Sequence, residues 1–310
     1  MKPRIIFMGT PVFACEILKC LVKEKYNVIG VVSQPDKKVG RKQIVTPTPL
    51  KLLALSYGMD VYQPIHIKDD IEILCALKPD LIITCAYGQF IPQSLLDYPT
   101  FGSINVHASL LPKLRGGAPI HKAILYGYKE SGISIMRMIK QMDAGSVMAQ
   151  SHVAIDDCDT MGTLSEKLAK SGCALLIESL PKILDGSAVF KEQDEALASY
   201  AYNISKEEEK VDFNQDIKLV YQHIRALIPT PTAYALVNHK KIKFHQVRCK
   251  VEAHNHTPGK LIGLIDQGYA IATINGYILV DELQIEGKSK CDARSFFNGM
   301  GRSLIGTILE

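Results

Sequence analysis

The chain has 310 residues, enough for two domains with separate hydrophobic cores. Hydrophobic residues make up 47% and charged residues 22%, the proportions of an ordinary globular protein, which exclude a disordered or fibrous chain. The net charge of +4 permits an anionic partner without requiring one.

The N-terminus and the cysteines indicate the compartment. Lys2 and Arg4 precede an apolar run that ends at residues 9–11, too short for an export signal or a membrane span. The eight cysteines include no Cys-x-x-Cys pair, and several fall in predicted helices or strands, as buried free thiols do. We therefore predict a cytoplasmic protein that does not enter a membrane.

Predicted strands and helices alternate over the first 189 residues. The strands are apolar runs at residues 4–8, 28–33, 80–86, 102–107, 133–138 and 147–155, and helical patterns cover 48–57, 71–77 and 160–184. Continuous apolar strands between helices predict a Rossmann-like α/β fold, with a mostly parallel sheet covered on both faces. Only Gly9 of a Gly-x-Gly-x-x-Gly fingerprint follows the first strand, so a dinucleotide ligand is not predicted.

The pattern changes near residue 190. Residues 191–203 lack periodicity, and a helix predicted at 216–228 ends at Pro229 and Pro231. Short alternating segments follow at 233–237, 242–247, 260–265, 269–274 and 277–285, with a hairpin signal at Asn275-Gly276. These segments predict a small antiparallel, OB-like β-barrel. The expected organisation is a domain at 1–189, a linker at 190–207 and a barrel domain at 208–310.

The most informative segment is the predicted strand that ends at His107. Alternation places Asn105 and His107 on one face of the strand, and Ile104 and Val106 on the other. A carboxamide and an imidazole are costly to bury unless they are hydrogen-bonded or used in chemistry. An isolated Asn-x-His is more often a satisfied core pair, so the residues around it decide between the two interpretations.

Those residues form a longer pattern. Asn105 and His107 are followed by Ser-Leu-Leu-Pro at 109–112, then by Arg115-Gly116, and about 35 residues later by Asp143 in Met-Asp-Ala-Gly. The pattern resembles the folate-dependent formyltransferases. Residues 6–14, Ile-Phe-Met-Gly-Thr-Pro-Val-Phe-Ala, resemble in particular the start of the methionyl-tRNA formyltransferases.

The resemblance implies a reaction and a set of site residues. The reaction is transfer of the formyl group of 10-formyltetrahydrofolate to the α-amino group of methionyl initiator tRNA. The implied catalytic residues are Asn105, His107 and Asp143, and the implied folate-binding residues are Ser109, Leu110, Leu111 and Pro112. Asn105 and His107 would donate to the oxygen of the reacting carbonyl. Asp143 would orient His107 or accept a proton, and the sequence leaves both roles open.

Two basic segments are candidate tRNA contacts. Residues 36–42 carry four cations and one acid, and the resemblance implies that Lys38, Arg41 and Lys42 in this loop contact the acceptor stem. Residues 238–260 of the barrel carry six cations and one acid, which suits a nucleic-acid surface. An ordinary solvated surface remains the alternative for both. His254 and His256 lack structural zinc spacing, so we predict no metal, and we expect a monomer.

Several alternatives stay open. Ser109, His107 and Asp143 also suit a hydrolytic triad, although no Gly-x-Ser-x-Gly surrounds Ser109. The same site also suits release of formate from folate to water, or transfer to a nucleotide-linked amine. Arg115 would contact the substrate or fix its loop. Phe213 and Thr230 stand where the resembled enzymes usually have tryptophan, which leaves the packing around the barrel undecided.

Overall fold

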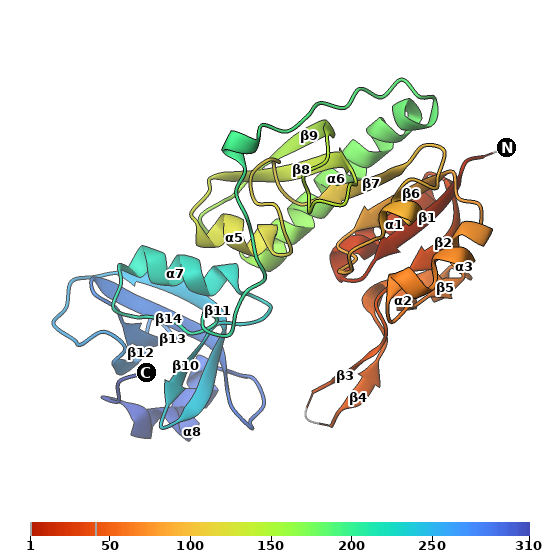
Figure 1. The fold of residues 1–310 in the computed structure, drawn as a ribbon. Coiled ribbons are helices and arrows are strands. Elements are labelled where there is room, and N and C mark those ends of the chain that lie inside the picture. Colours follow the sequence, from red (N-terminus) through yellow and green to blue (C-terminus); the bar gives the residue numbers. More distant parts are fainter. Residues whose placement is uncertain (1, 41) are drawn as a thin grey trace. The chain divides into compact units, whose positions relative to one another are not determined.

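The computed structural model describes residues 2–40 and 42–310 (Figure 1). They form two compact units. The first unit contains the residues up to Pro119, together with Glu130–Ala154 and Ser165–Tyr202. The second unit contains Ile120–Lys129, Ile155–Leu164 and Asn203–Glu310.

The first unit is built on a seven-stranded sheet with the order β5-β2-β1-β6-β7-β8-β9. Its strands are β1 (Arg4–Gly9), β2 (Asn27–Val32), β5 (Val61–Tyr62), β6 (Leu81–Cys85), β7 (Ser103–His107), β8 (Glu130–Arg137) and β9 (Val147–Ala154). The pairs from β5 to β7 are parallel, whereas β8 runs antiparallel to both β7 and β9. The predicted mostly parallel α/β sheet is confirmed, and its last two strands add an antiparallel edge.

Helices cover both faces of this sheet. They are α1 (Val12–Lys23), α2 (Pro49–Ser56), η1 (Ile67–Asp69), α3 (Ile71–Ala76), α4 (Gln93–Leu96), most of α6 (Met161–Leu184), and the short η2 (Glu195–Leu197). A Cβ added at Gly172 of α6 would lie 3.4 Å from Val106 of β7 and 3.5 Å from Ile133 of β8, so α6 packs closely on these strands (Figure 1). On the other face, Leu74 of α3 and Leu95 of α4 share a buried cluster with Ile82 of β6.

The basic segment after β2 forms a hairpin in place of the predicted irregular loop. The strands β3 (Lys37–Val39) and β4 (Ile44–Thr46) pair antiparallel in a sheet of their own, with Lys38 opposite Val45. All residues of both strands are exposed, so no buried face produces the alternation that predicts a strand. Arg41, one of the predicted tRNA contacts, lies outside the described residues.

The second unit is an antiparallel β-structure. Its six-stranded sheet contains β10 (Tyr234–Val237), β11 (Lys240–Val251), β12 (Leu261–Ile265), β13 (Gly268–Ala272), β14 (Gly276–Ile285) and β15 (Cys291–Asp292). The C-terminal residues connect the two ends of the strand order, because Glu310 exchanges backbone hydrogen bonds of 2.9 and 3.0 Å with Leu236 of β10, and Thr307 accepts one of 2.8 Å from Leu261 of β12. This connection closes the predicted small barrel.

The helices of this unit are α5 (Pro119–Leu125) from its second residue on, the first turn of α6, α7 (Ile217–Ala226), α8 (Ala293–Gly299) and η3 (Gly301–Leu304). Ile217, Val220 and Ile224 form the buried face of α7 in the barrel core. Phe213 is also buried there, edge-to-face with Phe244 at a centroid distance of 6.1 Å. The aromatic replacement at 213 therefore fills the core, whereas the side chain of Thr230 is exposed.

The cysteines and the helices also bear on the predictions made from the sequence. All eight cysteines are free, and burial raises the pKa of the Cys173 thiol to about 12, so this thiol is unreactive at neutral pH. None of the helices described has both the length and the apolar character needed to cross a bilayer.

Candidate active site

The site is built on β7, whose side chains alternate as the sequence predicts. His107 is the last residue of the strand, and Asn105 lies two residues earlier on the same face. Val106 points to the opposite face, where α6 packs. The two polar side chains thus lie at the carboxyl end of a strand inside the sheet, where open α/β folds place ligands.

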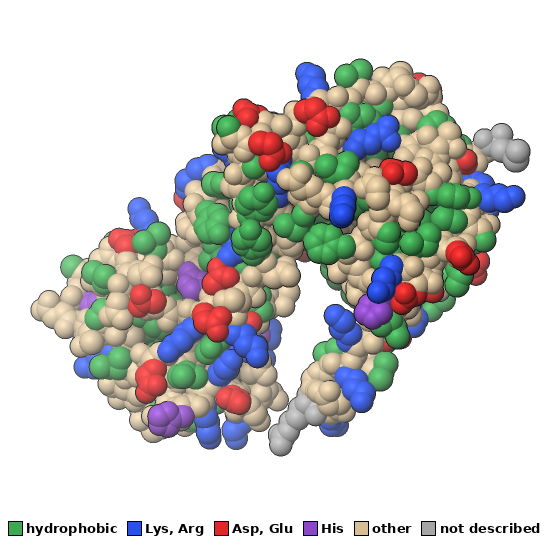
Figure 2. Space-filling view, viewed as in Figure 1, with side chains coloured by type: hydrophobic (Ala, Val, Ile, Leu, Met, Phe, Trp, Pro, Cys, Tyr) green, Lys and Arg blue, Asp and Glu red, His purple; other side chains and the backbone are tan. Residues whose placement is uncertain are grey.

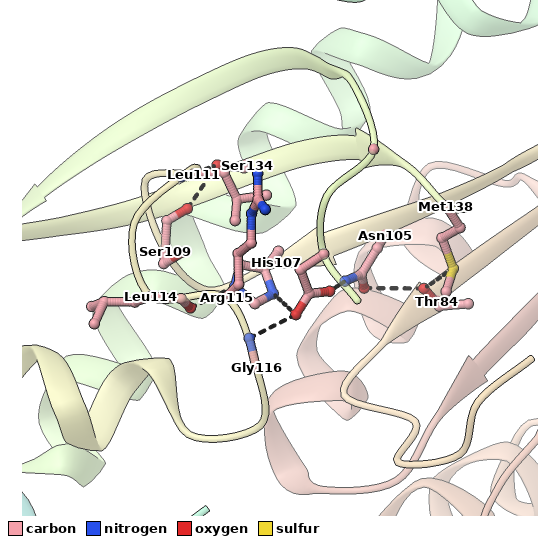
Figure 3. Close-up of polar contacts among 12 residues, drawn as sticks. Thr84, Asn105, His107, Ser109, Leu111, Leu114, Arg115, Gly116, Ser134 and Met138 are labelled. Carbon is pink, nitrogen blue, oxygen red and sulfur yellow. Dashed lines mark hydrogen bonds and ion pairs between the residues drawn. The ribbon is translucent and has the colours of Figure 1, made fainter. Parts of the chain in front are cut away.

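Asp143 joins these two residues from the connection between β8 and β9. Its Oδ2 accepts a hydrogen bond of 2.8 Å from the backbone N–H of Gly116 and lies 3.7 Å from His107 Nδ1 (Figure 3). Its Oδ1 lies 3.5 Å from Asn105 Nδ2. The three predicted catalytic residues therefore converge, at separations that are long for hydrogen bonds. Such contacts often shorten only when the reactants are bound.

Thr84 of β6 sets the orientation of the Asn105 amide. Its buried hydroxyl is within hydrogen-bond distance of three acceptors, Asn105 Oδ1 at 3.0 Å, the Ile104 carbonyl at 3.2 Å and Met138 Sδ at 2.9 Å, and the bond to Asn105 is the one that orients the amide. The Asp143 carboxylate accepts hydrogen bonds, as it does from Gly116 N–H, so it favours the amide nitrogen on its side. Asn105 therefore presents its N–H₂ group to the site. The sequence analysis did not identify Thr84, which lies 21 residues before its partner on another strand.

The ring of His107 is fixed from both edges. The ring is 6% exposed, and Nε2 donates to the carbonyl of Leu114 at 3.1 Å, an assignment that follows because a carbonyl oxygen only accepts. The other ring nitrogen, Nδ1, faces Asp143 Oδ2. The imidazole is thus aligned with its Nδ1 edge toward the carboxylate.

The loop after β7 is ordered by internal hydrogen bonds. Ser109 Oγ donates to the carbonyl of Lys113 at 2.6 Å. The carbonyl of Ser109 accepts from Ser134 Oγ at 2.7 Å (Figure 3). Ser109 is 1% exposed, and its hydroxyl has no hydrogen bond to His107 in this arrangement, which disfavours the Ser-His-Asp triad. Leu111 is also buried, whereas Leu110 and Pro112 are half-buried and keep accessible surface.

Arg115 fixes the loop, the second of its two predicted roles. Its side chain is fully buried and makes a two-pronged ion pair with Glu195, with Nη2–Oε1 at 2.7 Å and Nη1–Oε2 at 3.0 Å. The guanidinium holds the pKa of Glu195 below its usual range, and this carboxylate in turn raises the pKa of Arg115. The guanidinium also donates to Gln193 Oε1. Both partners belong to the segment predicted as a linker.

Position 116 requires a glycine. Its φ is +120°, and a Cβ added there would lie 2.8 Å from the carbonyl oxygen of Ala201. This close approach allows residues 115–118 to pair with residues 199–201, since Ala118 N–H donates to the Ala201 carbonyl at 2.9 Å. The Gly116 N–H is thereby directed at Asp143.

Lys38 and Lys42, the predicted tRNA contacts among the described residues, lie apart from these residues, on the hairpin. Lys38 belongs to β3 and Lys42 to the turn before β4, and both are exposed. In the barrel, two of the six cations are already paired. Arg248 makes a two-pronged ion pair with Asp281, and Lys250 pairs with Glu252 and Asp266. Figure 2 accordingly shows basic side chains interspersed with acidic ones on the visible face of the second unit.

The residues described contain no group of three or more potential metal ligands. The two ring nitrogens of His254, one of the histidines considered for a metal, are engaged by the backbone: Nε2 donates to the Gly276 carbonyl at 3.0 Å, and Nδ1 accepts from His256 N–H at 3.1 Å.

Comparisons with known proteins agree with this arrangement. Residues 2–180 match the formyl transferase family, and residues 203–301 match the family of its C-terminal domain. The chain is 44% identical over 301 residues to the methionyl-tRNA formyltransferase of Bacillus licheniformis, which covers 96% of this chain and 95% of that protein. It is 46% identical over 305 residues to the enzyme of the same name from Macrococcus caseolyticus, which covers 98% of this chain and 97% of that protein.

Solved structures are similar at lower identity. HypX from Aquifex aeolicus in complex with tetrahydrofolic acid matches with a TM-score of 0.73 and 18% identity over 98% of this chain, which spans about half of that protein, 48% of its length. An N-formyltransferase from Helicobacter canadensis matches with a TM-score of 0.67 and 19% identity, over 90% of this chain and 99% of that protein. These likenesses concern the fold. The full-length relatives show that the chain belongs to the methionyl-tRNA formyltransferase family.

Proposed function

We propose that this protein transfers the formyl group of 10-formyltetrahydrofolate to the α-amino group of methionyl initiator tRNA, giving the formylmethionyl-tRNA that starts translation. The observation that carries the proposal is the convergence of Asn105, His107 and Asp143 at the end of β7. The chain that carries these three residues is similar over nearly its full length to enzymes named methionyl-tRNA formyltransferase.

The main chemical difficulty is the weak electrophile. A formyl group on a folate nitrogen resembles an amide, and negative charge develops on its oxygen as the amine attacks. One well-placed donor to such an oxygen contributes about a hundred- to thousandfold in rate. Asn105 supplies this donor, because its amide nitrogen faces the site and carries a second hydrogen besides the one directed at Asp143.

The reaction also needs a proton acceptor and a proton donor. The free α-amino group has a pKa of about 7.7–8.0, so a useful fraction of it is unprotonated at neutral pH and can attack without a covalent enzyme intermediate. After attack, the amine nitrogen loses a proton, and the folate nitrogen gains one as its bond to the formyl carbon breaks. Asp143 accepts the first proton, directly or through water, and returns it to the folate nitrogen; His107 shares this proton with Asp143 across the Nδ1–Oδ2 contact.

The folate site lies along the loops beside these residues. Of the four residues predicted to bind folate, Leu110 and Pro112 keep accessible surface for contact, whereas Ser109 and Leu111 are buried and shape the loop. Ile139, which is 42% exposed in the connection that carries Asp143, provides apolar surface for the opposite side. Folate is a co-substrate here, consumed in each turnover.

Methionyl initiator tRNA is the second substrate. Residues 1–189 form the catalytic domain in this proposal, residues 208–310 the tRNA-binding domain, and residues 190–207 connect them. Lys38, Arg41 and Lys42 contact the acceptor stem, and Lys240, which is exposed on β11, contributes to a phosphate-binding surface on the barrel. The protein acts as a monomer in the cytoplasm.

One assay tests the proposal. Formyl transfer from 10-formyltetrahydrofolate is measured on initiator methionyl-tRNA and on elongator methionyl-tRNA, with formate release followed in parallel. We expect formylmethionyl-tRNA to form faster on the initiator than on the elongator, with little free formate. Formate without formylmethionyl-tRNA would instead identify a hydrolase. Formylation of a nucleotide-linked amine, with tRNA left unmodified, would identify the other alternative.

A further inference from the structure

The turn that carries Asp143 has an unusual backbone conformation. Asp143 has a φ of +49°, in the left-handed region that residues with a side chain seldom adopt. Such a conformation persists only where neighbouring contacts hold it. The hydrogen bond from Gly116 N–H to Oδ2 fixes the side chain but not the peptide groups of the turn.

Gln193 binds those peptide groups. Its Nε2 donates to the carbonyl of Asp143 at 2.8 Å and to the carbonyl of Gly145 at 2.7 Å. The two hydrogens of one amide nitrogen thus join both ends of the three-residue turn. Gln193 is 50 residues away from Asp143 in the sequence, so the contact exists only in the folded chain.

Arg115 determines which way round the Gln193 amide lies. Its Nε and Nη2 donate to Gln193 Oε1 at 3.1 and 2.9 Å. A guanidinium only donates hydrogen bonds and the two carbonyls only accept them, so the reversed amide would oppose like groups on both sides. Glu195 balances the buried charge of Arg115 and holds the guanidinium in place.

These contacts close a ring of hydrogen bonds around Asp143. From Arg115, one path leads along the chain to Gly116, whose N–H donates to the Asp143 carboxylate. The other path leads through the side chain to Gln193, which donates to the Asp143 backbone. The carboxylate of Asp143 is therefore held by Gly116 and its peptide carbonyl by Gln193, and Arg115 connects these two partners.

We infer that Gln193, held by Arg115, is a positioning residue that keeps the Asp143 carboxylate in register with His107 and Asn105. The inference rests on the proposed catalytic role of Asp143. Gln193 touches no reacting atom in this scheme; it acts through the turn. A displacement of about 1 Å at a catalytic group is enough to cost roughly a hundredfold in rate.

Two variants test the inference. Gln193→Glu keeps the length of the side chain and an oxygen for Arg115, but turns a second oxygen toward the two carbonyls. Gln193→Leu removes the amide without adding charge, and it carries the test if Gln193→Glu fails to fold cooperatively. Glu192→Gln, at the exposed neighbouring position, is the matched control. We expect both Gln193 variants to lower kcat for formyl transfer about ten- to hundredfold, with KM for both substrates within about twofold.

A double-mutant cycle separates positioning from general stability. If Gln193 acts through the Asp143 carboxylate, Gln193→Leu should cost less than about twofold in kcat when it is introduced into the Asp143→Asn variant. The inference would be overturned if the double variant lost kcat by the product of the two single-variant losses. A folded Gln193→Leu variant with normal kcat would overturn it as well. These results require active wild-type protein. A wild type that transfers no formyl group would instead contradict the proposed function.

Discussion

Replacing Asp143 with Asn tests the centre of the proposed mechanism, because it removes one negative charge while almost preserving the shape of the side chain. In the wild type, Oδ2 accepts from Gly116 N–H at 2.8 Å and faces His107 Nδ1 at 3.7 Å, and Oδ1 faces Asn105 Nδ2 at 3.5 Å. All three neighbours present nitrogen to the carboxylate. In the variant, one carboxylate oxygen becomes an N–H₂ group.

The size of the effect follows from these contacts. The amide oxygen can keep the bond to Gly116, although a neutral acceptor is about half as strong as a charged one. The new nitrogen then opposes the amide nitrogen of Asn105. Hydrogen bonds to charged groups contribute about 1.5–3 kcal/mol each. Weakening two such contacts by a total of about 3 kcal/mol in the transition state lowers kcat more than a hundredfold, at about 1.36 kcal/mol per tenfold.

The assay is single-turnover formyl transfer to methionyl initiator tRNA, with thermal unfolding to verify the fold. Asp97→Asn is the control, since Asp97 is exposed and bonds only to Gln93 among the hydrogen bonds seen for its side chain in the described structure. We expect Asp97→Asn to leave kcat unchanged and His107→Ala to match the loss of Asp143→Asn. Near-normal turnover of a folded Asp143→Asn variant would refute the assignment of a catalytic carboxylate.

Four further outcomes are expected. Ser109→Ala should keep most of the transfer activity, because the hydroxyl bonds within its own loop; complete loss with folate still bound would restore the triad. Thr84→Val should lower kcat about tenfold without changing KM, as the Asn105 amide loses the donor that orients it, and unchanged kcat would contradict that role. Replacing both Lys38 and Lys42 with Ala should weaken tRNA binding and reduce the salt dependence by about one unit of slope per lost phosphate contact; an unchanged slope would identify an ordinary surface. Because the folded-state pKa of Glu195 is lowered, its stabilising contribution is present above the ordinary glutamate pKa of about 4.3 and is lost as the pH falls through the folded value. Urea unfolding of Glu195→Gln should therefore show a stability deficit at pH 7 that narrows below about pH 4, and a deficit independent of pH would argue against the ion pair.

Local pattern predicted much of the architecture. The apolar strands of the first unit, the amphipathic α7 and the Asn275-Gly276 hairpin all follow from periodicity and turn chemistry within short windows. The alternation along β7 likewise placed Asn105 and His107 on one face before any tertiary contact was known. These features depend on residues that are close in sequence, so the sequence alone determines them.

The direction of the strands and the exposed β3–β4 hairpin do not follow from local sequence pattern. The sequence of an apolar strand has the same pattern whether the neighbouring strand is parallel or antiparallel. The antiparallel direction of β8 therefore depends on how the chain returns to the sheet. The residues of β3 and β4 are all exposed, and their pairing produces no buried face to mark them. Residues 193–201 have no period because their order comes from bonds to the loop after β7.

The candidate site combines both kinds of information. The sequence, through its resemblance to known enzymes, predicted which side chains carry the chemistry: Asn105, His107 and Asp143. Only the tertiary structure decided what orients them, because Thr84 and Gln193 act across 21 and 50 residues of chain through single hydrogen-bonded amide groups. Such a contact leaves no periodic trace in a sequence, since it depends on the folded position of one polar side chain and not on the burial of a repeated face.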